Sequence, residues 1–318
     1  MLPAVIVHAD WGTSPKKRVS AAARRLPDGR YRIEAPEMVG RSGSWRQRLS
    51  VPSDDVGPVL IGFDFPIGVP GGYAARAGIR SFPEALHEFG HGDWSEFYDV
   101  CTRPAQISLR RPFFPKSCPV AGMCRQEHLT AALGLNWDEL HRRCERKTVD
   151  RRAACPLFWT LGGNQVGKGS IAGWRECVQP MVEEGGDIGL WPFDGALAEL
   201  LKCRSILIVE TYPTEFYGHL GFRLGSGRGN GKQSQSARQA VAKHLLTAAV
   251  QLGCEFSGAA HEAVAGGFGP RRDGEDPFDA MVGVLGILKH LHASKPIEAP
   301  ADPAVQSVEG WILGQRPG

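Results

Sequence analysis

Short apolar runs separated by turn residues predict the strands of this chain. Runs of about four to eight apolar residues between turn signals are typical of buried strands. Residues 4–7, 59–63 and 205–209 have this character. Residues 19–26 and 31–36 flank a Pro-Asp-Gly turn and predict a hairpin, in which apolar and charged positions alternate as in a half-buried strand.

The remaining segments favour helices and loops. Between residues 67 and 202, helical patches alternate with loops rich in Gly and Pro. Residues 236–252 have the pattern of an amphipathic helix, and a last helix is expected from near Pro277 to about Leu291. Residues 294–318 are rich in Pro and Ala, so we expect a tail there.

The order of these elements predicts the fold class. Antiparallel strands followed by strand–helix units indicate an α/β fold with a mixed five-stranded sheet flanked by helices. We expect a core made of residues 1–66 and 204–293, interrupted by a large, mostly helical insertion at 67–203 and followed by the tail at 294–318. A length of 318 residues suits about two domains, or one domain with a large insertion.

Five acidic residues stand where such a fold places ligands. Asp10, Asp64 and Glu210 each close a predicted central strand, and the carboxyl ends of parallel strands meet at one edge of the sheet. Asp276 and Asp279 lie three residues apart on the last helix and face the same way. Crowded carboxylates are stabilised by a cation, and all-oxygen ligands suit Mg²⁺ or Mn²⁺. Two such ions could hydrolyse a phosphodiester with a metal-bound water as nucleophile.

Each acid also has a simpler interpretation. Asp276 and Asp279 could be an N-cap and a first-turn anion of their helix. Asp64 could end a strand in a turn, while Asp10 and Glu210 could pair with Arg or Lys. The hypothesis of a catalytic metal site therefore depends on all five residues meeting in space.

Four segments that carry these acids resemble the RNase H-like superfamily, and within it the predicted nucleases of domain-of-unknown-function family 429. The segments are residues 7–12 (Val-His-Ala-Asp-Trp-Gly), 61–68 (Ile-Gly-Phe-Asp-Phe-Pro-Ile-Gly), 209–213 (Val-Glu-Thr-Tyr-Pro) and 276–280 (Asp-Pro-Phe-Asp-Ala). The last segment is similar to the helix of the final acids in RuvC-type resolvases, and the Glu210 segment to the acidic strand of YqgF-type nucleases. Residues 158–168 and 190–195 resemble signatures of one branch of the family.

The resemblance implies an RNase H-like fold and a metal-dependent nuclease acting on DNA or RNA. It covers the whole chain loosely and these segments well, whereas the large insertion departs from the compact nucleases. Two alternatives stay open. One is an ATP-dependent phosphotransferase of the actin-like or sugar-kinase type, because Asp10 to Thr13 is similar to their first phosphate loop. The other is a non-catalytic nucleic-acid-binding module on the same fold.

Basic residues supply candidate contacts to a phosphate backbone. Lys and Arg number 37 against 34 Asp and Glu, and a net charge of +3 does not by itself indicate a nucleic-acid-binding protein. A Gly- and Ser-rich loop after the Glu210 strand carries Arg228 and Lys232. Lys168 lies in a Gly-rich segment close to a P-loop pattern, but Gly169 stands where Ser or Thr would hold Mg²⁺.

Zinc sites and membrane insertion are weaker possibilities. Residues 87–91 match H-E-x-x-H without the further ligand pattern of a zinc protease, and Cys118, Cys124 and His128 could bind structural zinc only with an unusually wide cysteine spacing. No apolar stretch approaches the ~18 residues of a membrane span, and we see no signal peptide. We therefore expect a cytoplasmic protein with no membrane partner. The sequence does not predict the oligomeric state.

Overall fold

A mixed sheet forms the centre of the molecule. The computed structural model describes residues 1–318 apart from 50–56, 121, 149–151, 162–165, 226–230 and 318. The strands of the described residues are β1 (Val5–Trp11), β2 (Arg18–Arg25), β3 (Tyr31–Ile33), β4 (Glu37–Met38), β5 (Val59–Phe63), β6 (Ile188–Leu190), β7 (Ile206–Glu210) and β8 (Cys254–Phe256). They are ordered β6-β7-β5-β1-β2-β3-β8, with β4 beside β2. The predicted mixed α/β sheet flanked by helices is confirmed.

Strand β2 is antiparallel to its neighbours β1, β3 and β4, whereas the pairs β1–β5, β5–β7, β6–β7 and β3–β8 are parallel. The prediction of five strands is too low, because β4, β6 and β8 are only two or three residues long. Such short edge strands leave almost no alternation for a sequence pattern to reveal.

Helices cover both faces of the sheet. The α-helices are α1 (Ser42–Arg48), α2 (Gly71–Ala77), α3 (Phe82–Glu88), α4 (Gln126–Leu133), α5 (Val166–Gly173), α6 (Gln179–Glu183), α7 (Leu197–Cys203), α8 (Pro213–His219), α9 (Gln235–Gln251), α10 (Gly258–Ala265) and α11 (Glu275–Leu291). The short 3₁₀ and π helices are η1 (Pro15–Lys17), η2 (Gly92–Trp94), η3 (Pro104–Gln106), η4 (Asp138–Leu140), η5 (Arg143–Glu145), η6 (Trp174–Val178), η7 (Arg271–Gly274) and η8 (Val305–Glu309). Among the described helices, none has the length and apolar character needed to cross a lipid bilayer.

Helix α11 packs directly on β1 and β2, and two glycines allow this close approach. A Cβ atom on Gly283 would lie 2.0 Å from the His8 ring, and one on Gly286 would lie 2.1 Å from the Phe216 ring. Real Cβ atoms never come so close to other heavy atoms, so neither position accepts a side chain without a shift of the helix. The position of α11 over β1 is therefore set by small residues at the contact.

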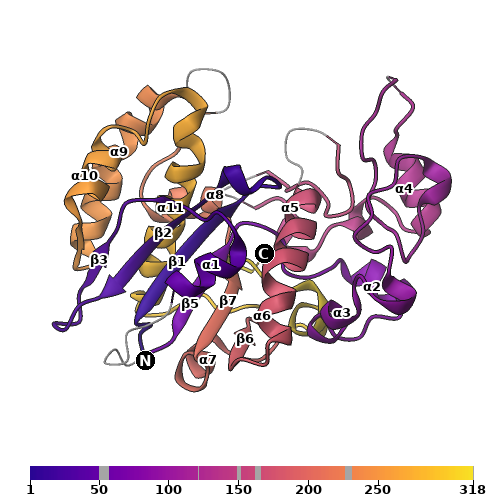
Figure 1. The fold of residues 1–318 in the computed structure, drawn as a ribbon, viewed down its shortest axis with the longest axis horizontal. Helices are drawn as coiled ribbons and strands as arrows, with labels where there is room; N and C mark the ends of the chain where they lie inside the picture. Colours follow the sequence, from indigo (N-terminus) through magenta and orange to yellow (C-terminus); the bar gives the residue numbers. More distant parts are fainter. Residues whose placement is uncertain (50–56, 121, 149–151, 162–165, 226–230, 318) are drawn as a thin grey trace.

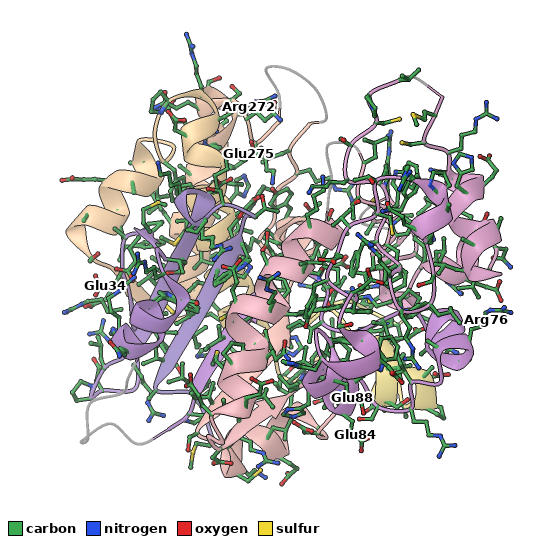
Figure 2. The ribbon with its side chains drawn as sticks, turned by 45° about the vertical axis from the view of Figure 1, so that its right-hand side comes forward. Glu34, Arg76, Glu84, Glu88, Arg272 and Glu275 are labelled. Carbon is green, nitrogen blue, oxygen red and sulfur yellow. The ribbon has the colours of Figure 1, made fainter. Side chains whose placement is uncertain are left out.

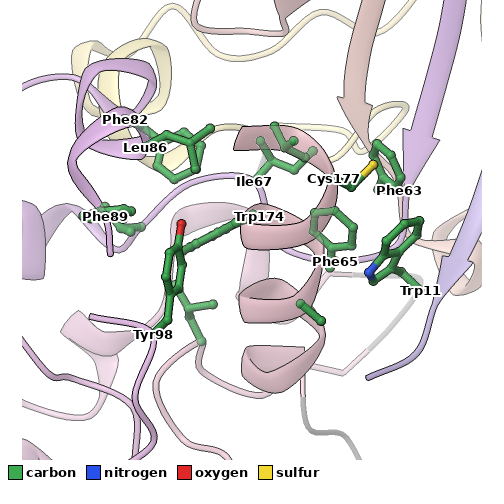
Figure 3. Packing of buried hydrophobic residues seen from close by; sticks show 14 of the residues in the cluster. Trp11, Phe63, Phe65, Ile67, Phe82, Leu86, Phe89, Tyr98, Trp174 and Cys177 are labelled. Carbon is green, nitrogen blue, oxygen red and sulfur yellow. The ribbon is translucent and has the colours of Figure 1, made fainter. Parts of the chain in front are cut away.

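Aromatic residues fill the other face of the sheet. Trp11, Phe63 and Phe65 lie together on this face, with ring centroids 5.5 Å apart for Trp11 and Phe63 and 4.8 Å for Phe63 and Phe65 (Figure 3). The continuous helix formed by α5, η6 and α6 covers them, and its Trp174 indole donates a hydrogen bond of 2.7 Å to the Pro66 carbonyl. Large buried aromatic rings contribute much of the apolar area in such a core.

The segment predicted as an insertion, 67–203, lies between β5 and β7 and shares its core with the sheet. Its buried residues form one cluster with those of β1 and β5. Its last part, β6 followed by α7, extends the sheet as a strand–helix unit. Figure 1 shows α2, α3 and α4 at one end of the molecule and α9 and α10 at the other.

The prediction of a tail at 294–318 does not hold for residues 305–315, most of which are buried. Val305, Val308 and the run Trp311, Ile312 and Leu313 are buried against the core. The backbone N–H of Leu313 donates a 2.9 Å hydrogen bond to the Glu210 carbonyl at the end of β7. Because the segment is rich in Pro and Ala, its few apolar residues did not predict a packed segment. Their burial stabilises the end of the chain against the sheet.

Candidate active site

Strand register places Asp10 and Asp64 side by side. Ala9 of β1 is paired with Phe63 of β5 in a parallel ladder, so the next residue of each strand is the neighbour of the other. Because side chains alternate between the two faces of a sheet, both carboxylates lie on the face that α11 covers. The backbone N–H of Trp11 donates a 2.8 Å hydrogen bond to Asp64 Oδ1 and fixes the orientation of that carboxylate.

Helix α11 brings the other two aspartates to the same place. The contact between Gly283 and His8 sets the height of the helix over β1. Asp279 lies one helical turn before Gly283, and Asp10 lies two residues after His8 on the same face of β1. The helix begins at Glu275, with Gly274 at its N-cap, so Asp276 is in the first turn and is not the cap.

The pKa values of these carboxyl groups are raised because they are buried and close to one another. Burial raises the pKa of Asp10 well above its ordinary value, and Asp64, Asp279 and Asp276 raise it further. Burial raises the pKa of Asp64 to about 7, although the hydrogen bond from Trp11 acts in the opposite direction. The pKa values of Asp276 and Asp279 are also raised, first by burial. Four acids therefore share one region whose negative charge is incompletely compensated.

Lys232 is the basic residue in contact with this group. Its ammonium pairs with the Asp279 carboxylate and lies 3.4 Å from Glu275 Oε1. The hydroxyl of Tyr217 donates a 3.2 Å hydrogen bond to Asp279 Oδ1. Burial acts to lower the pKa of Lys232, but its interactions with Asp279, Tyr217 and Asp10 together outweigh burial and hold the pKa above the ordinary value.

The donor chemistry of the four aspartates suits a hard divalent cation, because all of their donor atoms are carboxylate oxygens. Within the described part of the chain, however, no three or more His, Cys, Asp or Glu side chains are grouped so as to hold a metal ion. The Asp64 carboxylate faces the Trp11 N–H, and Asp279 faces Lys232 and Tyr217. Metal binding would therefore require these side chains to exchange their present partners.

Glu210 does not join the four aspartates. It is paired with Phe63 across the β5–β7 ladder, so its side chain lies on the face of Phe63, opposite to Asp64. Thr211, one residue later, occupies the position on the α11 face and donates its backbone N–H and hydroxyl to the Phe63 carbonyl. The prediction that Glu210 lies beside Asp10 and Asp64 is therefore wrong. Glu210 comes one residue before the position at the end of β7 that faces α11.

A buried arginine already binds Glu210. Arg142 donates two hydrogen bonds of 2.7 Å to the two carboxylate oxygens of Glu210 and one of 2.9 Å to Glu145. The backbone N–H of Ile67 donates a further 2.7 Å bond to Glu210. Both oxygens of Glu210 are thus occupied by donors from the insertion, as in the simpler interpretation that paired this residue with Arg or Lys.

The three predicted phosphate contacts differ in position. Lys232 lies among the acids. Lys168, on α5, donates a 3.1 Å hydrogen bond to the Lys116 carbonyl. The next residue, Gly169, lies against the end of β1, since its Cβ would be 3.4 Å from the Trp11 carbonyl oxygen. Arg228 lies outside the described residues.

The other motifs do not form sites in the described residues. Helix α3 ends at Glu88, so His87 and His91 are not one helical turn apart as a zinc helix requires. Figure 2 shows Glu88 in the lower part of the view and Glu275, the first residue of α11, in the upper part. The thiols of Cys118 and Cys124 donate to the carbonyls of Val120 and Ser117, and no metal cluster of three or more ligands forms there among the described residues.

Sequence reasoning missed three features of the site. Glu275 precedes Asp276 directly, so this pair of adjacent acids at the start of the helix could have revealed it. No sequence pattern predicts a role for Tyr217, because its contact with Asp279 depends on how α8 packs beside α11. The ring nitrogens of His8 are buried and have no hydrogen-bond partner among the described residues, and burial lowers the pKa of His8 to about 3, so the ring is neutral.

Comparisons with protein-family models, with curated proteins and with solved structures found no match to this chain.

Proposed function

We propose that this protein is a divalent-metal-dependent nuclease that hydrolyses phosphodiester bonds of DNA or RNA. The convergence of Asp10, Asp64, Asp276 and Asp279 at one edge of the sheet carries the proposal. These four carboxyl groups have raised pKa values from burial and mutual repulsion, which is the electrostatic state of an acidic site prepared for a cation.

The sheet supports the RNase H-like part of the proposal. Three antiparallel strands, β1 to β3, are followed by β5 and β7, which run parallel to β1. This is the sheet expected from the resemblance of residues 7–12 and 61–68. Asp10 and Asp64 close two adjacent central strands, where open α/β sheets bind their ligands.

The four aspartates would bind the metal, and Glu210 would have a structural role. Asp10 and Asp64 project from strand ends whose backbones are fixed by the ladder, so they would give rigid ligands for Mg²⁺ or Mn²⁺. Asp276 and Asp279 would complete the oxygen donors from α11. A divalent cation bound there would lower the pKa of water and stabilise a leaving oxygen. Glu210 has no part in this site and serves to anchor the insertion to β7 through Arg142.

Basic side chains near the acids favour a phosphate-containing substrate. Lys17, on η1, is close enough to lower the pKa of Asp276. Lys168 is on the helix that abuts the end of β1. Cations near an acidic centre attract a polyanion, and this attraction weakens with salt.

The test is hydrolysis of labelled nucleic acids by the purified protein. Single-stranded DNA, duplex DNA, RNA, RNA–DNA hybrid and branched DNA would be incubated with Mn²⁺ or with EDTA. We expect at least one of them to be cut only with Mn²⁺, and Asp10→Asn to reduce the rate at least about 100-fold. Asp28→Asn is the matched control, because Asp28 lies in an exposed turn paired with Arg30 and should change nothing.

A second set of titrations separates the alternatives. Binding of Mg·ATP without cleavage of any nucleic acid would favour a phosphotransferase over a nuclease. Tight nucleic-acid binding that Asp10→Asn leaves intact, with no cleavage by either protein, would indicate a non-catalytic module. Either outcome would overturn the proposed hydrolysis.

A further inference from the structure

Lys232 differs from the surface lysines of this chain in its contacts. Its ammonium binds Asp279, whose side chain is 5% exposed, and it also reaches Glu275. By contrast, Lys202 pairs with Glu199 on the same exposed helix face, where both side chains are more than half exposed. An exposed pair of this kind contributes little, whereas a cation beside buried carboxylates interacts strongly.

The backbone of Lys232 is held in place by a buried arginine. Arg238 of α9 is 0% exposed and donates a hydrogen bond to the Lys232 carbonyl. The same guanidinium donates bonds of 2.8 Å and 2.7 Å to the carbonyls of Gly267 and Gly269, in the connection that leads to α11. Arg238 thus joins the segment of Lys232 to the segment before Asp276, so the lysine is positioned by the fold.

The charge of Lys232 reaches the whole acidic group. It lowers the pKa values of Asp10, Asp64, Asp276 and Asp279, which would otherwise be raised further. Its ammonium therefore does, with a single charge, the electrostatic task that a divalent cation would do with two. It also occupies an oxygen of Asp279 that the proposed site needs as a metal ligand.

We propose that Lys232 is a built-in counter-ion of the acidic site and that metal binding is an exchange, in which the divalent cation displaces the Lys232 ammonium from Asp279. This inference rests on the proposed function, because it needs a divalent ion at the four aspartates. Without metal, the Lys232–Asp279 pair stabilises the folded protein, and the need to break this pair sets a threshold for metal loading. The displaced ammonium, still tethered by Arg238 through its backbone, remains beside the site.

The direct test is a calorimetric titration of Mn²⁺ into four proteins: wild type, Lys232→Met, Lys232→Arg and Lys202→Met. We expect Lys232→Met to bind Mn²⁺ at least about tenfold more tightly than wild type, because a competing positive charge within a few ångströms of the ligands is gone. Lys232→Arg keeps the charge and should resemble wild type. Lys202→Met removes a surface lysine and should also bind as wild type does.

Thermal melting in EDTA gives a readout that does not involve metal. Lys232→Met should melt at a lower temperature than wild type and should regain most of that loss when Mn²⁺ is added. Equal or weaker Mn²⁺ binding by Lys232→Met, beside clear binding by wild type, would overturn the exchange and leave the proposed nuclease standing. Absence of Mn²⁺ binding in all four proteins would overturn the metal site itself.

A measurement on the wild-type protein covers the case in which Lys232→Met does not fold. Ammonium groups held in ion pairs exchange protons slowly enough to be followed by ¹⁵N–¹H correlation NMR of the lysine side chains. One lysine ammonium signal should be present in EDTA and should shift or vanish as Mg²⁺ reaches saturation. If Mg²⁺ binds and every lysine signal stays unchanged, Lys232 is not displaced and the inference is wrong.

Discussion

Two groups of buried charge lie on opposite faces of the same sheet, and they differ in how fully their charge is compensated. On one face, Arg142 donates to both oxygens of Glu210 and also to Glu145. On the other face, Asp10, Asp64 and two aspartates of α11 share the ammonium of Lys232. Burial raises the pKa of Glu145 in the first group as well, but there one guanidinium donates hydrogen bonds to both acids. In the second group a single ammonium faces four aspartates, all with raised pKa values.

The difference separates a structural role from a functional one. A buried ion pair with every oxygen bonded holds two parts of a chain together, here the insertion and β7, and leaves no capacity for a ligand. A group of acids that the fold brings together but does not neutralise retains affinity for a cation. The candidate site is therefore identified by acids whose negative charge is incompletely compensated. Position at a strand end does not identify it, because Glu210 also lies at a strand end.

The largest effect on stability should come from the saturated group. Arg142→Met leaves Glu210 and Glu145 buried without their cation, and breaking such a pair typically costs about 3–5 kcal/mol. We expect the free energy of unfolding, measured by urea denaturation, to fall by about this amount. A loss below about 1 kcal/mol would mean that the pair does not anchor the insertion.

The second-largest effect on stability should come from the contact between Gly283 and the His8 ring, which sets the distance of α11 from β1. Gly283→Ala places a Cβ about 2.0 Å from the His8 ring, and overpacking of this kind typically costs about 1–3 kcal/mol. Because the helix must shift, we also expect weaker Mn²⁺ binding in calorimetry. Gly258→Ala is the control, since an added Cβ there meets nothing within 4 Å. Unchanged Mn²⁺ affinity in Gly283→Ala would contradict the link between this contact and the site.

The uncompensated acids should make stability depend on pH. With its pKa raised from 3.8 to about 7, Asp64 binds more protons in the folded than in the unfolded protein between those values. Stability contributed by this proton is present below about pH 4 and is lost as the pH rises toward 7. Asp64→Asn has no carboxyl proton to lose, so in EDTA its unfolding free energy should fall less over this interval, by at least about 1 kcal/mol, the equivalent of a single pKa unit. Parallel curves for the two proteins would refute the interpretation.

The smallest effect should be that of Glu210 on metal binding. Glu210→Gln keeps the shape of the side chain, and its Mn²⁺ affinity should stay within about twofold of wild type, because Glu210 lies on the other face. Asp10→Asn should lose at least about tenfold in the same titration. The comparison requires that both variants retain the near-ultraviolet circular dichroism of wild type. Equal losses in the two variants would show that the two faces are not independent.

The sequence alone predicted part of this picture. The apolar runs gave β1, β5 and β7, and the rule that ligands bind at strand ends gave Asp10 and Asp64. The same rule failed for Glu210, because position at a strand end does not tell which face a side chain occupies, and a shift of one residue reverses the face. The face on which the Glu210 side chain lies can be assigned only when its pairing with Phe63 is known.

The remaining omissions have tertiary causes. The pairing of Lys232 with Asp279 joins residues 47 positions apart and depends on Arg238, so no local pattern contains it. Residues 305–313 fell within the segment predicted as a tail, 294–318, because a few apolar side chains among Pro and Ala predict no packing until the core that buries them is present. The motif at residues 87–91 failed for a local reason, since α3 ends at Glu88.

Crystals of the wild-type protein soaked in Mn²⁺, with diffraction recorded at an energy where manganese scatters anomalously, test the central claim most directly. The account predicts an anomalous peak among the carboxylates of Asp10, Asp64, Asp276 and Asp279, with the Lys232 ammonium moved away from Asp279 and no peak beside Glu210. A saturating soak that leaves those four carboxylates without a peak, or that places manganese at Glu210 instead, would contradict it.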